Sequence, residues 1–286
     1  MRGAKPWTAL EAAIRRGAAL RPGETVLAAV SGGPDSAALA ALLASAAARS
    51  GATLMLAHVN HALRASAWQD EGVVLALGAA LRARVATVSL EPGPADEARL
   101  RTERYAALAR LARAAGARRV FTAHHAADQT ETILMALFRG AGPSALGGMP
   151  AARELEAGVE LARPLLGIEP AVLRAYCAAA QLPFALDPTN VDSAYRRNAL
   201  RTALGALRED FPHLDAAVAR CAAIVREERD GAPAAALRRR LRAELVAAGG
   251  DTRDITFERL DAAARALERG RRGRHFLRRG VELVLE

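Results

Sequence analysis

The sequence predicts an α/β fold, a doubly wound parallel sheet followed by a smaller, mainly helical C-terminal domain. Over the first two-thirds of the 286 residues, short apolar strand-like runs alternate with helix-length stretches. This alternation is typical of a parallel sheet that is covered by helices on both faces. From about residue 211 onward the sequence contains helical patterns without strand alternation. We therefore predict one domain over residues 1–210 and a second over residues 211–286.

The individual elements follow from hydrophobic periodicity and from glycine and proline breaks. Strands are expected at residues 25–30, 53–59, 84–90, 119–123 and 159–165. Helices are expected at residues 8–20, 35–49, 66–81, 96–115, 127–138, 169–180, 195–207, 212–229, 232–247 and 255–269. Because ligands of such sheets bind beyond the carboxyl ends of the strands, the segments around Ser31, His58 and His124 are expected to converge there.

The turn after the first expected strand is rich in glycine and reads SGGPDS at residues 31–36. Glycines let the backbone approach a ligand closely, and the start of the next helix directs its N–H groups at an anion such as phosphate. The phosphate-binding P-loop requires a lysine after its last glycine, whereas the single lysine of this chain is Lys5. The sequence therefore indicates a nucleotide-binding turn of another kind, with a simple helix cap as the alternative.

Two acidic residues are candidates for a metal site. Asp35 would repel bound phosphates unless a divalent cation lies between them, which favours Mg²⁺ over a purely capping role. His124 and Asp128 follow the fourth expected strand at a spacing that puts both on one side of a helical turn. We expect Asp128 to complete the Mg²⁺ site with Asp35, and His124 to contact phosphate or stabilise developing charge. The alternative is ordinary polarity at an exposed helix N-terminus.

Two further blocks carry weaker signals. Residues 58–64 read HVNHALR and supply donors that could contact a nucleotide, although a polar loop after a buried strand explains them too. Residues 101–108 read RTERYAAL, and a helix that packs on the sheet accounts for Tyr105. Cys177 and Cys221 are isolated, lie in apolar helical patterns and are expected in the core, so neither a zinc site nor a disulfide framework is indicated.

Net charge and hydropathy limit the kinds of partner that this protein is expected to bind. The formal net charge is +9, from 40 basic and 31 acidic residues, which favours a polyanion, although a GC-rich genome also enriches arginine. A cluster of arginines surrounds His275 and Phe276 near the end of the sequence: Arg269, Arg271, Arg272, Arg274, Arg278 and Arg279. Such a cluster could bind the phosphates of RNA while the aromatic ring stacks on a base, or it could form a solvated, charged tail. No apolar run reaches the roughly 20 residues of a membrane span and no signal-peptide pattern is present, so we expect a cytoplasmic protein without a membrane partner.

Five blocks together resemble the tRNA(Ile)-lysidine synthases, a family of the PP-loop ATP pyrophosphatase superfamily. SGGxDS alone marks the superfamily, whereas the blocks that follow it are more specific. In the order of that family, and over most of residues 26–201, the chain contains SGGPDS, HVNHALR, RTERYAAL, TAHHAADQTETILMALFRGAG and DPTNVDSAYRRNALR. The family usually has HHxDDQ in the fourth block, and here the first of those acids is replaced by Ala127.

The resemblance implies a defined reaction and a set of site residues. ATP would adenylate the wobble cytidine of a tRNA(Ile) with a CAU anticodon, and free L-lysine would then displace AMP. It implies ATP and Mg²⁺ and allows a homodimer. Asp35, His124 and Asp128 are expected to be catalytic, and Asp35 and Asp128 are expected to hold the metal. The residues expected to contact ATP are Ser31, Gly32, Gly33, Pro34, Asp35, Ser36 and His58. Those expected to contact tRNA or the other substrate are Arg64, Glu131, Arg139, Arg197, Asn198 and Arg201.

Two other functions fit the sequence less well. A PP-loop tRNA cytidine thiolase is disfavoured because such enzymes cluster their cysteines, whereas Cys177 and Cys221 are far apart in the sequence. A noncatalytic RNA-binding module is disfavoured because binding alone does not require the set Asp35, His124, Asp128 and Glu131.

Overall fold

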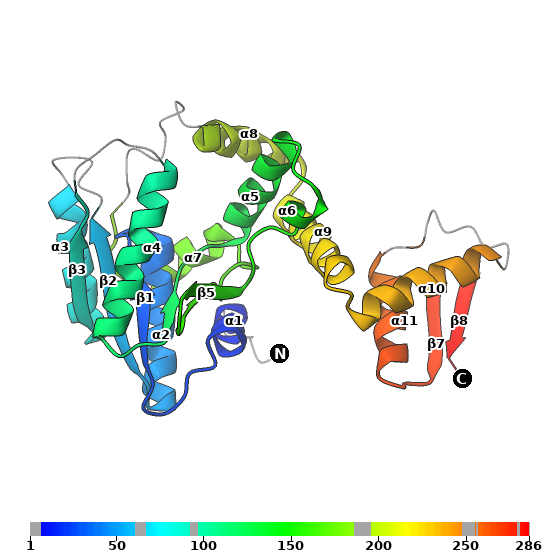
Figure 1. Cartoon of the computed structure of the whole chain (residues 1–286), viewed down its shortest axis with the longest axis horizontal. Coiled ribbons are helices and arrows are strands. Elements are labelled where there is room, and N and C mark those ends of the chain that lie inside the picture. The colour runs from blue at the N-terminus through cyan, green and yellow to red at the C-terminus, as the bar shows by residue number, and fades with distance from the viewer. Residues whose placement is uncertain are drawn as a thin grey trace. The chain divides into compact units, whose positions relative to one another are not determined.

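The computed structural model describes residues 7–60, 67–91, 97–185, 196–247, 255, 257–278 and 281–285. The chain forms two compact units (Figure 1). The sheet unit comprises Met1–Met135 and Gly148–Ala219, and the C-terminal unit comprises Ala136–Gly147 and Arg220–Glu286. The domain boundary at residue 210 stays a prediction. Arg64 lies outside the described residues.

The sheet unit contains one six-stranded sheet in the order β3-β2-β1-β4-β6-β5. The first five strands in that order are parallel, as expected for the predicted fold class. Their bounds are β1 (Thr25–Ala29), β2 (Thr53–Asn60), β3 (Arg84–Ser89), β4 (Arg119–Phe121) and β6 (Val159–Ala162). The sequence did not predict β5 (Ala152–Glu156), an antiparallel edge strand whose residues are almost all exposed and therefore carry little hydrophobic signal.

Alternate residues of the strands point to opposite faces of the sheet, and each face has its own core. Val26 and Ala28 contribute to one core and Leu27 to the other. The first core includes side chains of α1 (Thr8–Ala18), α2 (Pro34–Ser50), α3 (Ala67–Leu81) and α7 (Pro170–Ala179). The second includes side chains of α4 (Glu97–Ala114). The remaining helices of this unit are α5 (Ala126–Phe138), α8 (Arg196–Asp210) and the first part of α9 (Leu214–Arg229).

The strand order reverses between β1 and β4. The chain moves from β1 outward to β2 and β3, and then returns to place β4 on the other side of β1. In doubly wound sheets, such a reversal creates a crevice at the carboxyl ends of the two strands, where ligands bind. The loops that leave β1 and β4 carry Ser31 to Ser36 and His124 to Asp128.

The C-terminal unit adds helices and one β-hairpin. Its helices include α6 (Pro143–Leu146), α10 (Pro233–Ala247) and α11 (Phe257–Glu268), as well as the second part of α9. The hairpin pairs β7 (Gly273–Arg278) with β8 (Val281–Leu285). The sequence predicted the long helices but not the hairpin.

The hairpin was missed because β7 reads GRHFLR, a mostly charged sequence. Among the side chains of β7 that the structure describes, only Leu277 is fully buried, in a small core with Leu241 and Leu260. Phe276 is 70% exposed, and Arg274 is exposed beside it. Part of the predicted arginine cluster of the tail is thus ordered on a strand, and its role in binding RNA stays a prediction.

Two other sequence-based expectations have clear outcomes. Cys177 is buried in α7, as expected, whereas Cys221 is exposed, so the prediction that both cysteines lie in the core was wrong. Cys221 lies on α9, which is only partly covered, and an apolar-looking helical pattern does not reveal which of its faces is covered. Among the described residues, no helix is both long and apolar enough to cross a membrane.

A buried arginine ties the helices of the C-terminal unit together. Arg238 of α10 is 3% exposed and forms ion pairs with Glu227, Glu228 and Asp261. The guanidinium also lies 4.9 Å from the ring centroid of Phe257. One side chain of α10 is therefore bound to both α9 and α11.

We predict that Arg238→Met lowers the free energy of unfolding of the C-terminal unit by about 3 kcal/mol, because partly buried carboxylates lose their shared counter-charge. Urea unfolding measures the change. The matched control is Arg240→Met on the same helix, whose ion pair with Glu244 is exposed, and it should cost less than about 0.5 kcal/mol. Equal effects of the two substitutions would contradict a structural role for Arg238.

Candidate active site

The loop after β1 wraps tightly around the start of α2. Gly32 adopts a φ of +95°, in the left-handed region that favours glycine, and Gly33 caps the helix with Pro34 at its first position. The Ser36 hydroxyl donates a hydrogen bond to the Gly33 carbonyl at 2.9 Å. The backbone N–H of Ser31 donates to Ser36 Oγ at 3.2 Å. These bonds fix the first turn of α2, whose N–H groups and dipole favour an anion.

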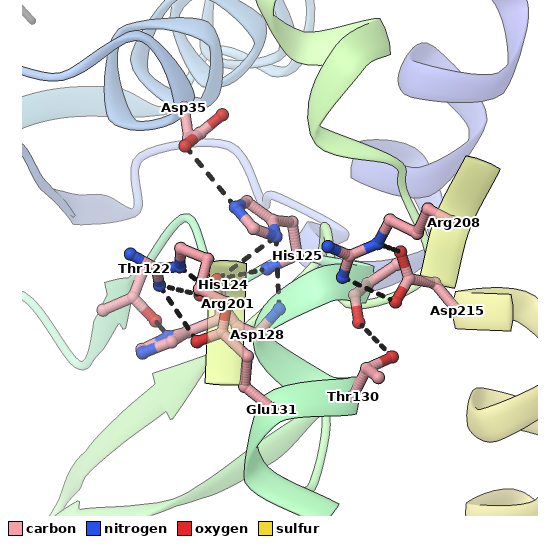
Figure 2. Close-up of polar contacts among 11 residues, drawn as sticks. Asp35, Thr122, His124, His125, Asp128, Thr130, Glu131, Arg201, Arg208 and Asp215 are labelled. Carbon is pink, nitrogen blue, oxygen red and sulfur yellow. Dashed lines mark hydrogen bonds and ion pairs between the residues drawn. The ribbon is translucent and has the colours of Figure 1, made fainter. Parts of the chain in front are cut away.

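The two loops of the crevice meet at His125. Its Nε2 lies 3.5 Å from Oδ2 of Asp35, and its Nδ1 lies 3.3 Å from Oδ2 of Asp128. Figure 2 shows the imidazole between the two carboxylates. The backbone N–H of His125 also donates to Asp128 Oδ2 at 3.0 Å. Because His125 immediately precedes α5, this bond is one half of a capping box.

Both carboxylates act on the charge of His125. Burial alone would lower its pKa, but the contact with Asp35 and the charges of Asp128, Asp35 and Glu131 raise the pKa above its ordinary value of 6.5. The imidazole is thus more readily protonated than a free histidine. A positive His125 balances part of the negative charge that Asp35 and Asp128 bring to the crevice.

The pKa of His124 is shifted in the opposite direction, below its ordinary value. Burial lowers its pKa to about 3, and the charges of Arg163, Arg104 and Arg101 add to the effect. Its Nδ1 is 2.8 Å from the hydroxyl of Thr122. His124 is therefore neutral near pH 7 and can offer one N–H to a ligand. The sequence singled out His124 as the partner of Asp128, but the structure gives that contact to His125.

Glu131 and Arg201 form a second polar group beside the crevice. Glu131 is 1% exposed, and both of its oxygens accept hydrogen bonds from Arg201, at 2.8 and 2.9 Å. Arg201 Nη2 also lies 3.8 Å from Asp128 Oδ1. This pair holds α8 against α5. Two residues that the sequence assigned to the substrate are thus in direct contact with each other.

Another ion pair fixes the start of α9. Arg208 donates to both oxygens of Asp215, at 2.8 and 3.0 Å. The Thr130 hydroxyl of α5 donates to the carbonyl of Ala126 at 3.3 Å. Figure 2 shows Thr130, Arg208 and Asp215 next to the catalytic candidates. Helices α5, α8 and α9 are therefore linked through buried polar contacts.

The other predicted residues lie in different settings. His58 is 3% exposed within β2, and its Nδ1 is 2.8 Å from the carbonyl of Val30, directly below the loop. Arg139 is exposed and belongs to the C-terminal unit. Arg197 and Asn198 lie in the first turn of α8. The proposed contacts of these residues with ATP or tRNA stay predictions.

The donor set at the crevice fits Mg²⁺. Oδ1 of Asp35 is buried and has no hydrogen-bond partner, which is an unfavourable state for a carboxylate oxygen unless a ligand completes it. Carboxylate oxygens are the ligands that Mg²⁺ prefers, and this ion usually takes one or two of them together with phosphate oxygens. Within the described residues no larger group of acidic, histidine or cysteine side chains could hold a metal.

Comparison with known proteins agrees with this geometry. Residues 8–207 match the family model described as the PP-loop domain. The tRNA(Ile)-lysidine synthase of Bordetella pertussis is 43% identical over 74% of this chain and 67% of its own length. This chain belongs to the tRNA(Ile)-lysidine synthase family. The member from Symbiobacterium thermophilum is 42% identical over 76% of this chain and 47% of its own length. The chain thus spans about half the length of the first curated relatives that it matches.

A solved structure supports the fold. The U34-tRNA thiolase NcsA from Methanococcus maripaludis has a TM-score of 0.65, with 15% identity, over 76% of this chain and 77% of that chain. At this identity the similarity concerns the fold alone.

Ala127 lies in the first turn of α5 and is 5% exposed. It is the position at which this chain departs from the usual tRNA(Ile)-lysidine synthase pattern.

We predict that the two adjacent histidines titrate in opposite directions. In NMR titrations His125 should have a midpoint above 6.5, whereas His124 should stay neutral down to about pH 3. His124→Gln and His125→Gln assign the signals. Asp35→Asn should lower the midpoint of His125, because it removes the negative charge that faces Nε2 of the imidazolium. An unchanged midpoint in this variant would contradict the contact.

The depressed pKa of His124 also has a consequence for stability. Between pH 6.5 and about 3 the unfolded chain takes up a proton on this residue that the folded chain does not. Stability therefore falls as the pH drops through this window. We expect the free energy of unfolding of His124→Gln to depend less steeply on pH in this window, as measured by urea unfolding at a series of pH values.

We predict that Arg201→Met lowers the free energy of unfolding by about 2 kcal/mol, since buried Glu131 loses two charge-assisted hydrogen bonds. Arg201→Lys restores the charge but not the paired geometry and should recover part of the loss. Denaturant unfolding compares the three proteins. Identical midpoints for all three would show that the pair does not hold α8 to α5.

Proposed function

We propose that this chain catalyses the formation of lysidine at the wobble cytidine of a tRNA(Ile) with a CAU anticodon, with consumption of ATP. The observation that carries the proposal is the contact of Asp35 and Asp128 with His125 beside the loop at residues 31–36, in a chain of this family. The loop suits phosphates, and the carboxylates suit a metal that neutralises them.

In the proposed first step the O2 oxygen of the cytidine attacks the α-phosphorus of ATP, and pyrophosphate leaves. The turn at residues 31–36 binds the phosphates through its N–H groups, so positioning supplies much of the catalysis. Asp35 and Asp128 would hold Mg²⁺, which supplies charge neutralisation when it is bound. His125 keeps both carboxylates oriented, and His124, being neutral, can donate a hydrogen bond to a phosphate oxygen or to the activated base.

In the proposed second step the ε-amine of free L-lysine attacks C2 of the activated cytidine. The C2–O bond then breaks, AMP departs with that oxygen, and the amine loses a proton. No nucleophilic side chain of the protein is required, because lysine supplies the nucleophile. A cytoplasmic location and a homodimer accompany this proposal as expectations.

Lysine incorporation tests the proposal. The purified chain is incubated with ATP, Mg²⁺, labelled lysine and tRNA(Ile) transcripts that have C or U at the wobble position. We expect label in the CAU transcript only, with one AMP formed for each lysine incorporated. No incorporation into either transcript would overturn the proposal, and uptake of sulfur from a sulfide donor would instead favour a thiolase.

Asp35→Ala tests the first step separately. AMP formation should fall by about a hundredfold or more, because metal-assisted charge neutralisation is worth several kcal/mol in the transition state. Affinity for tRNA, measured by filter binding, should change little. The control is Glu11→Gln, which removes an exposed carboxylate of α1. Equal AMP formation by Asp35→Ala and the parent would remove Asp35 from the mechanism.

A further inference from the structure

His58 reaches the residue at which the chain leaves the sheet. It lies in β2 directly after Ala57, which pairs with Ala29 of β1. Its neighbour on the adjacent strand is therefore Val30, whose N–H donates to the carbonyl of Ala57 at 2.8 Å. The carbonyl of Val30 accepts a hydrogen bond from Nδ1 of His58, also at 2.8 Å. Because His58 is 3% exposed, water competes little for this bond.

The partner of Nδ1 decides which nitrogen of His58 carries the hydrogen. A carbonyl oxygen only accepts hydrogen bonds, so Nδ1 must be the donor. In the neutral ring Nε2 then carries a lone pair, which repels phosphate oxygens and has no hydrogen to donate to them. The bond to Val30 therefore leaves the neutral ring without a donor for a phosphate group.

Other carbonyls of the turn at residues 31–36 are also held by donors from outside it. The N–H of Ala185, which follows α7, donates to the carbonyl of Gly32 at 2.9 Å. The thiol of Cys177, in α7, donates to the carbonyl of Pro34 at 3.0 Å. A carbonyl oxygen carries partial negative charge and repels an anion, whereas N–H groups that converge in a turn bind one. Donors from three segments thus fix the directions of the Val30, Gly32 and Pro34 carbonyls.

The bond from His58 also fixes the first N–H of the turn. The carbonyl of Val30 and the N–H of Ser31 belong to one planar peptide group and point in opposite directions. That N–H donates to Ser36 Oγ at 3.2 Å, and the Ser36 hydroxyl donates in turn to the carbonyl of Gly33. A rotation of this peptide group would therefore break the contact that closes the turn on α2.

We propose that His58 is a positioning residue, which sets the turn for the phosphates of ATP and does not itself contact the nucleotide. Its effect passes from Nδ1 to the Val30 carbonyl, and from there through the Ser31 N–H to Ser36. The sequence predicted a direct contact of His58 with ATP, because no local pattern shows that the side chain binds the backbone of a neighbouring strand. This role rests on the use of ATP in the proposed function and is independent of the substrate that ATP activates.

Two amide substitutions separate the nitrogens of the ring. His58→Asn keeps an N–H donor near the position of Nδ1, whereas His58→Gln moves the donor toward the position of Nε2. Isothermal titration calorimetry with ATP and Mg²⁺, without tRNA or lysine, gives the affinity of each variant. We expect His58→Gln to weaken ATP binding by about tenfold or more, since a buried carbonyl loses its donor. His58→Asn should stay within about threefold of the parent, because it still donates to Val30.

Two further measurements test whether the effect concerns the phosphates. Pyrophosphate lacks the adenosine, and His58→Gln should weaken its binding by a factor similar to that for ATP. In the complete reaction the KM for ATP should rise in this variant, while the KM values for lysine and tRNA stay nearly unchanged. Thermal unfolding of both variants is recorded because His58 is buried. The matched control is His213→Gln, which removes an exposed histidine and should bind ATP as the parent does.

The opposite pattern of the two amides would overturn this role. Parent-like ATP binding by His58→Gln, or lost ATP binding by a folded His58→Asn, would assign Nε2 to the nucleotide. Weakened ATP binding with unchanged pyrophosphate binding in His58→Gln would also overturn it and place the side chain against the adenosine. A parent that binds ATP but forms no lysidine would instead contradict the proposed function, and the affinities of the variants would still decide the role of His58.

Discussion

The contact of one imidazole with two carboxylates holds the crevice together. His125 bridges Asp35, which follows β1, and Asp128, which lies in α5 after β4. Both carboxylates lie past Ala28 and Phe121, the last residues that pair β1 with β4, so the strand ladder does not fix their positions. The capping bond from the His125 N–H to Asp128 fixes the carboxylate on α5, and the imidazole then reaches Asp35. The geometry of the candidate metal ligands therefore depends on a residue that need not touch a substrate.

The charges around them explain why the pKa values of the neighbouring His124 and His125 shift in opposite directions. His125 faces carboxylates and is stabilised in its charged form, whereas His124 is buried near arginines and is kept neutral. Negative charge thus gathers at Asp35 and Asp128, whereas positive charge gathers around Tyr105.

Hydrophobic periodicity predicted the parallel strands and nearly all the helices, because these elements bury continuous apolar faces. It failed for β5 and for the hairpin of β7 and β8, which expose most of their described side chains and read as charged loops. At the site, the motifs identified Asp35 and Asp128 but missed His125, although its place three residues before Asp128 at a helix start is the spacing of a capping box. The sequence paired His124 with Asp128 because helical spacing describes a formed turn, and His124 precedes it.

The sequence by itself determined the class of the fold, the glycine-rich turn and the acidic residues near it, because these depend on local pattern and on residue chemistry. It also carried the motifs of the family. The tertiary structure decided which side chains meet: His125 with Asp35, Arg201 with Glu131, and the arginines with Tyr105. Such contacts join segments that are distant in the chain, and their geometry follows from strand order and helix packing. No local pattern encodes that order, so charge pairing and the lack of it became visible only in the folded protein.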